Sequence, residues 1–555
     1  MNSRKPFDEQ LHQELHERSS QLIFRTWKMR IRSCIGIARA VLVCSALVLP
    51  ACVNRGAIDL APKYKPTEFT LPAAWHGSSP FVEAHPSDGV IRSKWWEIFD
   101  DPVLNALEEQ AMEANPELEA AAERFMQARD MMMKARSKLI PHIGIGAEPR
   151  VGRDSEGRLF RAPNAPVNDQ GINLGGLAHW EPDFWSQIRN ETRSQIYAAQ
   201  QKAAEYGLAR LSLQAEVAAD YFTLRGIDAQ NAIYHQSISY YERSLEVVNV
   251  KFEGHVASAL DVARAQYQLT MTQSRQLGLQ AEREVVEHAI AILVNRTPAS
   301  FSIEPVDTLT IGQFTIPQVV PSTLVERRPD VAAVERQVAQ ANRQIGIAKA
   351  AFFPKLRIAA DGGIEGQFGG LLKAANLFWS LGALITFSAF KGGSRRADLQ
   401  QAWSLYREME DHYRATLLQA FKEVEDGLSR TKLISEQLNR QKLAVVAAEE
   451  QQDLSMELYR GGLASSLDLI NSQVNTLDAR IVSAEIKANL LTSTVGLVRA
   501  LGGGWQRADL PSDDDVQPFK VFEYKGVKKP KPTSGIDVRL DERDEHRDLS
   551  KPSRQ

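Results

Sequence analysis

The chain has 555 residues and a net charge of −3 at pH 7, with 66 basic and 69 acidic residues mixed along its length. This balance argues against nucleic acid as a partner, because nucleic-acid-binding proteins concentrate positive charge. The three cysteines are Cys34, Cys44 and Cys52, so the chain beyond them offers no thiol pair and a disulfide framework is excluded.

The N-terminus is typical of an export signal. Basic residues between positions 25 and 32 precede an apolar run, Ala40–Leu49. That run has the length of a signal-peptide core and is too short to span a bilayer. We therefore predict a signal peptide at residues 1–51, with Met29 as an alternative translation start.

The end of this signal resembles the lipobox of bacterial lipoproteins, in which cleavage before a cysteine frees that cysteine for acylation. The sequence here is Leu49-Pro-Ala-Cys52, which predicts lipidation of Cys52 and attachment of palmitate. Val53 follows in place of the aspartate that keeps many such lipoproteins on the inner membrane. An ordinary signal peptide with an unrelated cysteine is the alternative.

Two ungapped matches show that the chain repeats itself. Residues 115–145 align on residues 328–358, and residues 252–262 align on residues 459–469. Two matches in the same order indicate a tandem duplication. We predict a first repeat at 52–310, which includes an N-terminal equatorial segment, and a second repeat at 311–510.

Each repeat contains a long stretch without proline. No proline falls between residues 182 and 298 or between residues 354 and 511, and both stretches are rich in strong helix formers. In the first stretch, apolar residues from Ile227 to Phe252 follow alternating steps of three and four, which is a coiled-coil seam. We predict helices at about 186–252 and 394–459, each roughly 100 Å long. A soluble coiled-coil rod is the alternative.

Before each long helix the hydrophobic period changes to two. From Leu377 to Phe387 every odd position is apolar, and Ile172, Leu174, Ala178 and Trp180 follow the same rule. This alternation is typical of a lipid-facing barrel wall, although a half-buried soluble sheet shares it. The predicted strands lie at about 142–151, 172–184, 355–364 and 377–388.

Four strands cannot close a barrel. An open edge in lipid leaves backbone groups unsatisfied, and the smallest outer-membrane barrels need about eight strands. Three copies would give twelve strands, whereas two would give an eight-stranded barrel that is too narrow for solutes to pass through. The chain is therefore expected to form a homotrimer, the symmetric solution.

The sequence offers no chemistry of an enzyme. It contains no HExxH, CxxC, phosphate-binding glycine loop or nucleophile elbow. The histidines beyond Cys52 show no helical i, i+3 or i+4 pairing, so no metal site and no cofactor are expected. No segment after the signal approaches 18 uninterrupted apolar residues, so no transmembrane helix is expected.

Several local motifs resemble the TolC-type outer-membrane efflux channels, in the lipoprotein branch that serves resistance-nodulation-division pumps. They cover about residues 52–505 and are Ala61–Pro66, Trp95–Leu107, Ala114–Leu118, Pro321–Val331, Ile345–Ala350, Phe353–Leu356 and Phe390–Ala397. The resemblance implies a trimer in the outer membrane of a Gram-negative bacterium: a twelve-strand β-barrel, an α-helical barrel through the periplasm and a small equatorial domain. It implies the exit duct of a tripartite efflux system for small molecules, working with a periplasmic adaptor and an inner-membrane pump, with no catalytic centre.

A repeated turn, Gly-x-x-Ala-Ser-x-Leu-Asp, interrupts both helical runs at equivalent places. In the family these turns form the periplasmic tip that meets the adaptor. The residues concerned are Gly254, His255, Val256, Ala257 and Ser258 in the first repeat, and Gly461, Gly462, Leu463, Ala464 and Ser465 in the second.

Two aspartates follow these turns. Ser258 and Ser465 are expected to cap the next helices, and His255 stands where the second repeat has Gly462. Asp468 matches a pore-gate aspartate of the family, with Asn471 where a second acidic layer would be. Asp261 is expected only to favour its helix N-terminus, a role that remains open for Asp468 too.

Residues 511–555 are expected to be a disordered charged tail, because almost nothing in them is apolar. Three alternatives to small-molecule efflux stay open. They are the duct of a type I protein secretion system, a lipid-anchored structural coiled-coil protein, and an outer-membrane-bound periplasmic enzyme for which no constellation is found.

Overall fold

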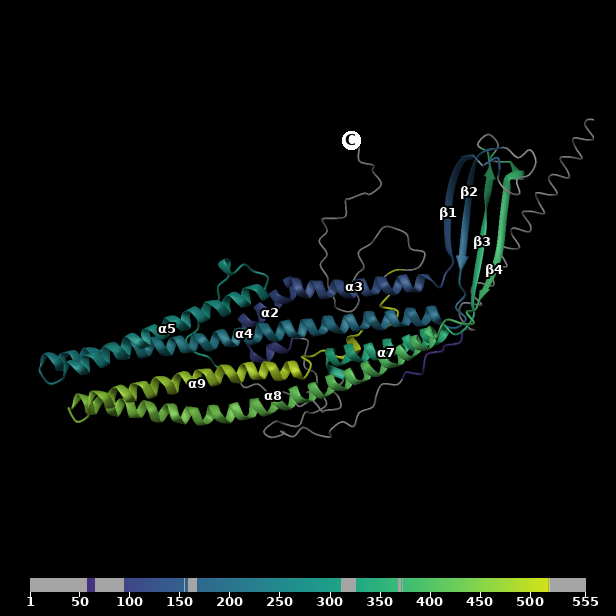
Figure 1. Cartoon of the computed structure of the whole chain (residues 1–555). Coiled ribbons are helices and arrows are strands. Elements are labelled where there is room, and N and C mark those ends of the chain that lie inside the picture. The colour runs from purple at the N-terminus through teal and green to yellow at the C-terminus, as the bar shows by residue number, and fades with distance from the viewer. Residues whose placement is uncertain are drawn as a thin grey trace, which may run out of the picture. The chain divides into compact units, whose positions relative to one another are not determined.

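The computed structural model describes residues 57–64, 94–153, 155–157, 167–310, 326–367, 371, 373–517 and 519 (Figure 1). The predicted signal peptide and Cys52 lie outside these residues. Two compact units divide the chain. Unit 1 comprises Met1–Ala61, Lys138–Asn190 and Gly346–Arg395, and unit 2 comprises Pro62–Ser137, Glu191–Ile345 and Arg396–Gln555.

Unit 1 contains one four-stranded antiparallel sheet in the order β1-β2-β3-β4. The strands are β1 (His142–Arg153), β2 (Asn168–Trp180), β3 (Lys355–Gly366) and β4 (Leu377–Thr386). They overlap the four predicted ranges, because alternation of apolar and polar residues suits a strand with two different faces. Each repeat contributes one hairpin, and β2 pairs with β3 to join the two hairpins.

Two strands end earlier than the sequence predicts. The second strand is predicted to reach residue 184, but β2 ends at Trp180, and β4 ends at residue 386 instead of 388. Pro182 has no N–H for a strand ladder. The Asp183 carboxylate instead accepts the backbone N–H groups of Ile188 (3.1 Å) and Arg189 (2.9 Å). The end of the predicted strand therefore holds the start of a helix.

The two repeats give helices of equal length. α4 (Gln187–Glu253) and α8 (Ser394–Arg460) have 67 residues each, and α5 (Ala259–Leu293) and α9 (Ser466–Ala500) have 35 each. The helices that precede the two hairpins, α3 (Pro116–Ser137) and α7 (Pro329–Ala350), have 22 residues each. This matching confirms the tandem repeat, and the long helices lie within one residue of the predicted bounds.

In unit 2 the two helical hairpins run side by side (Figure 1). The Tyr241 hydroxyl of α4 donates to the Gln473 carbonyl of α9 (3.1 Å), and the Gln473 amide donates to Ser244 (3.0 Å). On its other side, α9 accepts a hydrogen bond at the Ala479 carbonyl from Gln441 of α8 (2.9 Å). Because α9 contacts both α4 and α8, the two hairpins form one packed layer.

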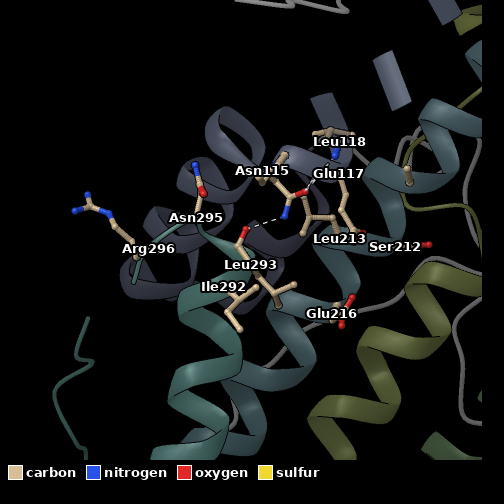
Figure 2. A pocket seen from close by; sticks show the side chains of 12 residues that line it. Asn115, Glu117, Leu118, Ser212, Leu213, Glu216, Ile292, Leu293, Asn295 and Arg296 are labelled. Carbon is tan, nitrogen blue, oxygen red and sulfur yellow. Dashed lines mark hydrogen bonds between the residues drawn. The ribbon is translucent and has the colours of Figure 1, made fainter. Parts of the chain in front are cut away.

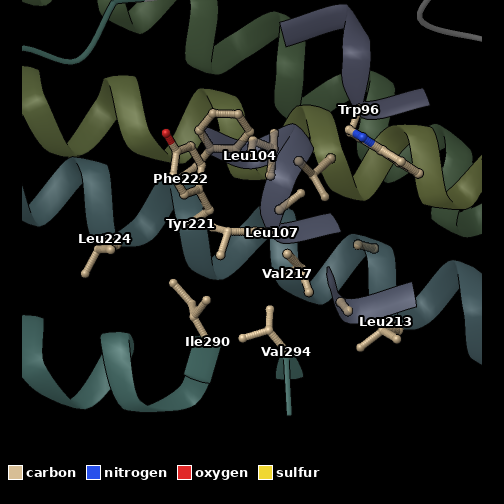
Figure 3. Packing of buried hydrophobic residues seen from close by; sticks show 14 of the residues in the cluster. Trp96, Leu104, Leu107, Leu213, Val217, Tyr221, Phe222, Leu224, Ile290 and Val294 are labelled. Atoms are coloured by element: carbon tan, nitrogen blue, oxygen red, sulfur yellow. The ribbon is translucent and has the colours of Figure 1, made fainter. Parts of the chain in front are cut away.

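A hydrophobic core joins the N-terminal elements of unit 2 to these long helices (Figure 3). These elements are η1 (Trp95–Phe99) and α2 (Pro102–Ala114). Leu104 and Leu107 of α2 pack in one cluster with Tyr221 of α4 and Ile290 of α5. The segment after residue 94 thereby forms part of the helical unit.

One aspartate links this core to the cap of α2. The Asp101 carboxylate accepts the Tyr221 hydroxyl (2.6 Å) and the backbone N–H of Val103 (2.9 Å). The Trp95 indole N–H donates to Gln214 (3.2 Å). These bonds account physically for the Trp95–Leu107 motif: its polar residues anchor η1 and α2 on α4.

The C-terminal tail is ordered further than the sequence predicts. Disorder is expected from residue 511 onward, but Val516 is fully buried and its carbonyl accepts the Nε–H of Arg129 (3.1 Å). Ser512 caps this turn by accepting the N–H of Asp515 (3.3 Å). One buried valine and one buried arginine therefore hold a segment whose composition alone suggests disorder; the rest of the tail lies outside the described residues, apart from residue 519.

Among the described helices, α9 is long and apolar enough to cross a membrane by length and composition. Half of its apolar window is buried inside the structure, as in a core helix. Leu491, Val495 and Val498 of α9 belong to the core cluster around Trp95. The apolar character of α9 is thus explained by packing within unit 2.

Candidate functional site

One face of the unit 1 sheet is apolar and uncovered. Ile143, Ile145 and Trp379 are 73%, 87% and 78% exposed. The strand register places Leu174, Leu381 and Ile385 on the same face. A soluble half-buried sheet would pack such a face against its own core. The exposed face matches the lipid-contacting side of a barrel wall instead.

The opposite face of the sheet is mostly polar. The Ser380 hydroxyl of β4 donates to the Asp361 carboxylate of β3 across this face. Glu148, Asn173 and Glu365 occupy one row of it by register. A barrel closed from such sheets would have an apolar exterior and a polar, water-compatible interior.

Aromatic side chains gather where the strands meet the helices. Trp185 stacks on Phe353 with ring centroids 4.5 Å apart, and its indole N–H donates to the Pro354 carbonyl (2.8 Å). The Arg395 guanidinium lies 5.5 Å from the ring centre of Phe352. Rings with a polar partner are typical of the girdle at a membrane interface.

The two repeated turns have the same backbone geometry. His255 (φ 62°) and Gly462 (φ 75°) each adopt the left-handed conformation at equivalent positions. The N–H of Val256 donates to the Lys251 carbonyl (2.8 Å), and that of Leu463 donates to the Leu458 carbonyl (2.8 Å). Each helix thus ends in a hydrogen-bonded left-handed turn, and His255 takes up the positive φ that glycine would otherwise supply.

Both predicted serine caps are present. The Ser258 hydroxyl accepts the N–H of Asp261 (3.3 Å), and the Ser465 hydroxyl accepts that of Asp468 (3.2 Å). Each aspartate in return accepts the backbone N–H of its serine, which completes a capping box. Hydrogen bonds from Ser465 lower the pKa of the Asp468 carboxyl, which is fully exposed. The geometry therefore shows a helix-capping role for Asp468; its role as a pore gate stays a prediction.

Side-chain contacts tie the two turns together. The Ser466 hydroxyl of α9 donates to the Asp261 carboxylate of α5, and this bond is the largest cause of the lowered Asp261 pKa. The Lys251 ammonium of α4 lies 4.1 Å from the ring centre of Tyr459 of α8 and donates to the Tyr459 carbonyl. Burial raises the pKa of Tyr459, with a smaller contribution from Asp261. Asp261 consequently joins the hairpins as well as capping its own helix.

The apolar tips of the turns stay open to solvent. Val256 is 75% exposed and Leu463 is 80% exposed. Both belong to the predicted adaptor-contact residues, and each lies between a left-handed turn and a serine cap. A rigid turn that presents an exposed aliphatic side chain suits a protein contact.

A cavity of about 580 Å³ lies at the α2–α3 corner (Figure 2). The Asn115 amide donates to the Leu293 carbonyl (3.0 Å), and its oxygen accepts the N–H groups of Glu117 (3.0 Å) and Leu118 (3.1 Å). Asn115 thereby caps α3 and holds the end of α5. The Ala114–Leu118 motif has a structural explanation here.

Sequence reasoning missed several of these contacts. Lys251, Tyr459 and Ser466 lie beside the predicted turns, but their pairing depends on how the two hairpins pack. His142 and His179 also form an unpredicted pair on the polar face of the sheet, because a search at helical spacings does not test cross-strand neighbours. Pairing the two predicted strands in register would have placed His142 opposite His179.

A family model described as outer membrane efflux protein matches residues 107–296 and 320–503. The pyoverdine export outer membrane protein OpmQ of Pseudomonas aeruginosa is 29% identical over 478 residues, covering 83% of this chain and 96% of the relative. The toluene efflux pump outer membrane protein TtgC of Pseudomonas putida is 27% identical over 460 residues, covering 81% and 93%. The solved structure of the outer-membrane channel OprN superposes with a TM-score of 0.75 at 27% identity, covering 80% of this chain and 99% of that one.

Proposed function

The chain belongs to the family of outer membrane efflux proteins and has the TolC-like fold expected from its motifs, and we propose that three copies form the exit duct of a tripartite small-molecule efflux system. The strands would cross the outer membrane, and the helices would enclose a passage through the periplasm. The work of such a duct is passage and gating, with no catalytic step. The apolar, uncovered face of the sheet is the observation that carries this proposal.

The edges of the sheet support assembly from several copies. Among the strands that the structure describes, β1 and β4 each pair on one side only. In lipid, an unpaired edge costs several kcal/mol per backbone group, so β1 of one copy would pair with β4 of the next. Three sheets of four strands give the twelve-strand barrel.

The helices of unit 2 support the same assembly. α5 and α8 each keep a row of aliphatic or aromatic side chains exposed along much of the helix. The exposed residues are Leu260, Tyr267, Leu277, Val285 and Ile292 on α5, and Leu433, Leu443, Val446, Leu454 and Leu458 on α8. Packing α5 of one copy against α8 of the next would bury both rows and close a ring.

Lipid anchoring at Cys52 is part of the proposal. The N–H of Ile58 donates to the Phe184 carbonyl (2.8 Å), beside the aromatic cluster at the strand ends. The six residues from Cys52 to Ile58 span at most about 20 Å when extended. An acyl chain on Cys52 would therefore reach the inner leaflet next to the barrel.

The tip residues are proposed to contact the periplasmic adaptor, and Asp468 is proposed to line the gate. The exposed Val256 and Leu463 support an adaptor contact, since they offer apolar surface on rigid turns. The named relatives export pyoverdine or expel toluene, so the duct fold serves chemically different small molecules. These names favour efflux over protein secretion for this chain.

Reconstitution into planar bilayers tests the function. The purified full chain should form ion-conducting channels of one unit size. A variant with Ile145→Arg and Trp379→Arg places charge on the proposed lipid face and should greatly reduce insertion, because Arg or Lys on the lipid face at mid-bilayer costs about 2–4 kcal/mol per residue. Absence of conductance from a correctly folded wild-type chain would overturn the proposal.

A further inference from the structure

Two histidines face each other on neighbouring strands of unit 1. His142 begins β1, and the register places it opposite His179 of β2. Their imidazole rings stack with centroids 4.7 Å apart and planes 29° apart, and both residues are exposed. Side chains directly opposite each other on one face of an antiparallel pair are close enough to bind a ligand jointly.

We propose that His142 and His179 together bind one divalent late transition-metal ion, such as Ni²⁺, Cu²⁺ or Zn²⁺. Imidazole nitrogen suits these metals, whereas Mg²⁺ and Ca²⁺ prefer oxygen ligands. Rotation of the two exposed rings about their side-chain bonds brings one nitrogen of each to the metal at about 2.0–2.1 Å. A cross-strand pair needs little backbone rearrangement, because the ladder already fixes both Cα positions.

Water completes the coordination. Among the described residues, no group of three or more His, Cys, Asp or Glu side chains is arranged to hold a metal ion. Two protein ligands give weaker binding than the three or four of catalytic and structural zinc sites. The site is accordingly one from which the metal exchanges readily.

Nearby charges tune this affinity. Glu181 lies two residues after His179, and its carboxylate is 3.7 Å from the Lys355 ammonium. In β3, Ala359 is the partner of His179, and Arg357 lies two residues before Ala359. The carboxylate attracts a cation, whereas the two basic side chains repel it. Removal of the Arg357 charge should therefore strengthen metal binding.

The pair lies on the polar face of the sheet, which carries Asp361 and Ser380. If three sheets close as proposed above, three such pairs surround the passage. They lie where β1 begins after α3 and where β2 ends before α4. This placement rests on the proposed barrel. Bound metal then adds positive charge to the interior and reduces the flow of cations.

The experiment titrates Ni²⁺ into the full chain, purified in detergent without a polyhistidine tag, by isothermal calorimetry at pH 7.5. Wild-type protein should bind one Ni²⁺ per chain. His142→Gln and His179→Gln should each weaken binding at least tenfold, and Arg357→Ala should strengthen it several-fold. His235→Gln removes an exposed histidine of α4 and serves as the matched control, with binding unchanged.

Binding that is absent in wild type, or unchanged in the two cross-strand variants, would overturn the metal site. Planar-bilayer recordings then separate this inference from the proposed function. Channels whose cation current falls on addition of Ni²⁺, and recovers with a chelator, support the interior placement. Channels that conduct but do not respond to Ni²⁺ contradict that placement alone, whereas a chain that forms no channels contradicts the duct itself.

Discussion

The Lys251 ammonium of α4 lies 4.1 Å from the ring centre of Tyr459 of α8, and the same amine donates a hydrogen bond to the Tyr459 carbonyl. The Lys251 side chain thus connects the end of the α4–α5 hairpin to the end of the α8–α9 hairpin. In each repeat, the contact falls within a few residues of the left-handed turn. A separation of the two hairpin ends would have to break this contact.

Lys251→Met should loosen the tip. The substitution keeps most of the side-chain length but removes the cation–π contact and the hydrogen bond, which together hold the two hairpin ends in contact by about 1–2 kcal/mol. Mean single-channel conductance in planar bilayers should rise. Lys442→Met, at an exposed lysine of α8 that precedes Tyr459 by 17 residues, is the control and should leave conductance unchanged. Equal conductance in the two variants would show that the contact does not restrain the tip.

Asp468 and Asp261 should respond differently to replacement by alanine. Three Asp468 carboxylates at one constriction would attract cations, so Asp468→Ala should weaken cation preference, modestly because Asn471 already removes one acidic layer. Asp261→Ala should act mainly on stability, because it removes a capping box and the bond from Ser466. Reversal potentials in a salt gradient measure the preference. Unchanged selectivity in the Asp468 variant, with an intact trimer, would leave that aspartate as a helix cap.

Glu108 predicts an unusual pH dependence of stability. Its side chain is fully buried in α2, and desolvation raises its pKa to about 9. The folded chain therefore keeps a proton that the unfolded chain loses above a pH of about 4.5. The stability that Glu108 contributes is complete below that pH and declines as the pH rises to about 9, by at most about 1.4 kcal/mol for each pH unit.

Glu108→Gln does not titrate, so its thermal midpoint should change less between pH 5 and pH 9 than that of the wild type. The difference between the two proteins should grow with pH. Glu109→Gln changes the neighbouring exposed carboxylate and should behave as the wild type does. A wild-type midpoint that rises steadily over this range would contradict the buried, protonated state of Glu108.

Cys52→Ser should abolish acylation, since the thiol is the acceptor in a lipobox. The variant should still insert, because the strands carry their own apolar face. Metabolic labelling with palmitate measures the first effect, and membrane fractionation the second. Label retained by the variant would disprove the lipobox assignment.

The pattern of neighbouring residues along the sequence was enough to predict the strands and the long helices. Alternation from Leu377 to Phe387 and the absence of proline after Pro182 are properties of neighbouring residues, and so are the serine caps. The contacts between Lys251 and Tyr459, and between His142 and His179, join residues far apart in sequence or on adjacent strands. They depend on packing and register, which periodicity does not specify.

The tail shows the same limit. Its composition predicts disorder from residue 511, yet burial of the single side chain of Val516 against α3 and α4 orders the segment up to residue 517. Glu108 is a second case, because helical periodicity does not reveal that a charged residue lies in the core.

The mass of the detergent-extracted protein tests the central claim most directly. The described residues of each chain supply four strands and leave β1 and β4 as edges of the sheet, so a monomer should not persist in the membrane. Light scattering coupled to size exclusion should give three times the mass of the mature chain after subtraction of detergent. A stable monomer that retains its sheet would contradict the shared barrel.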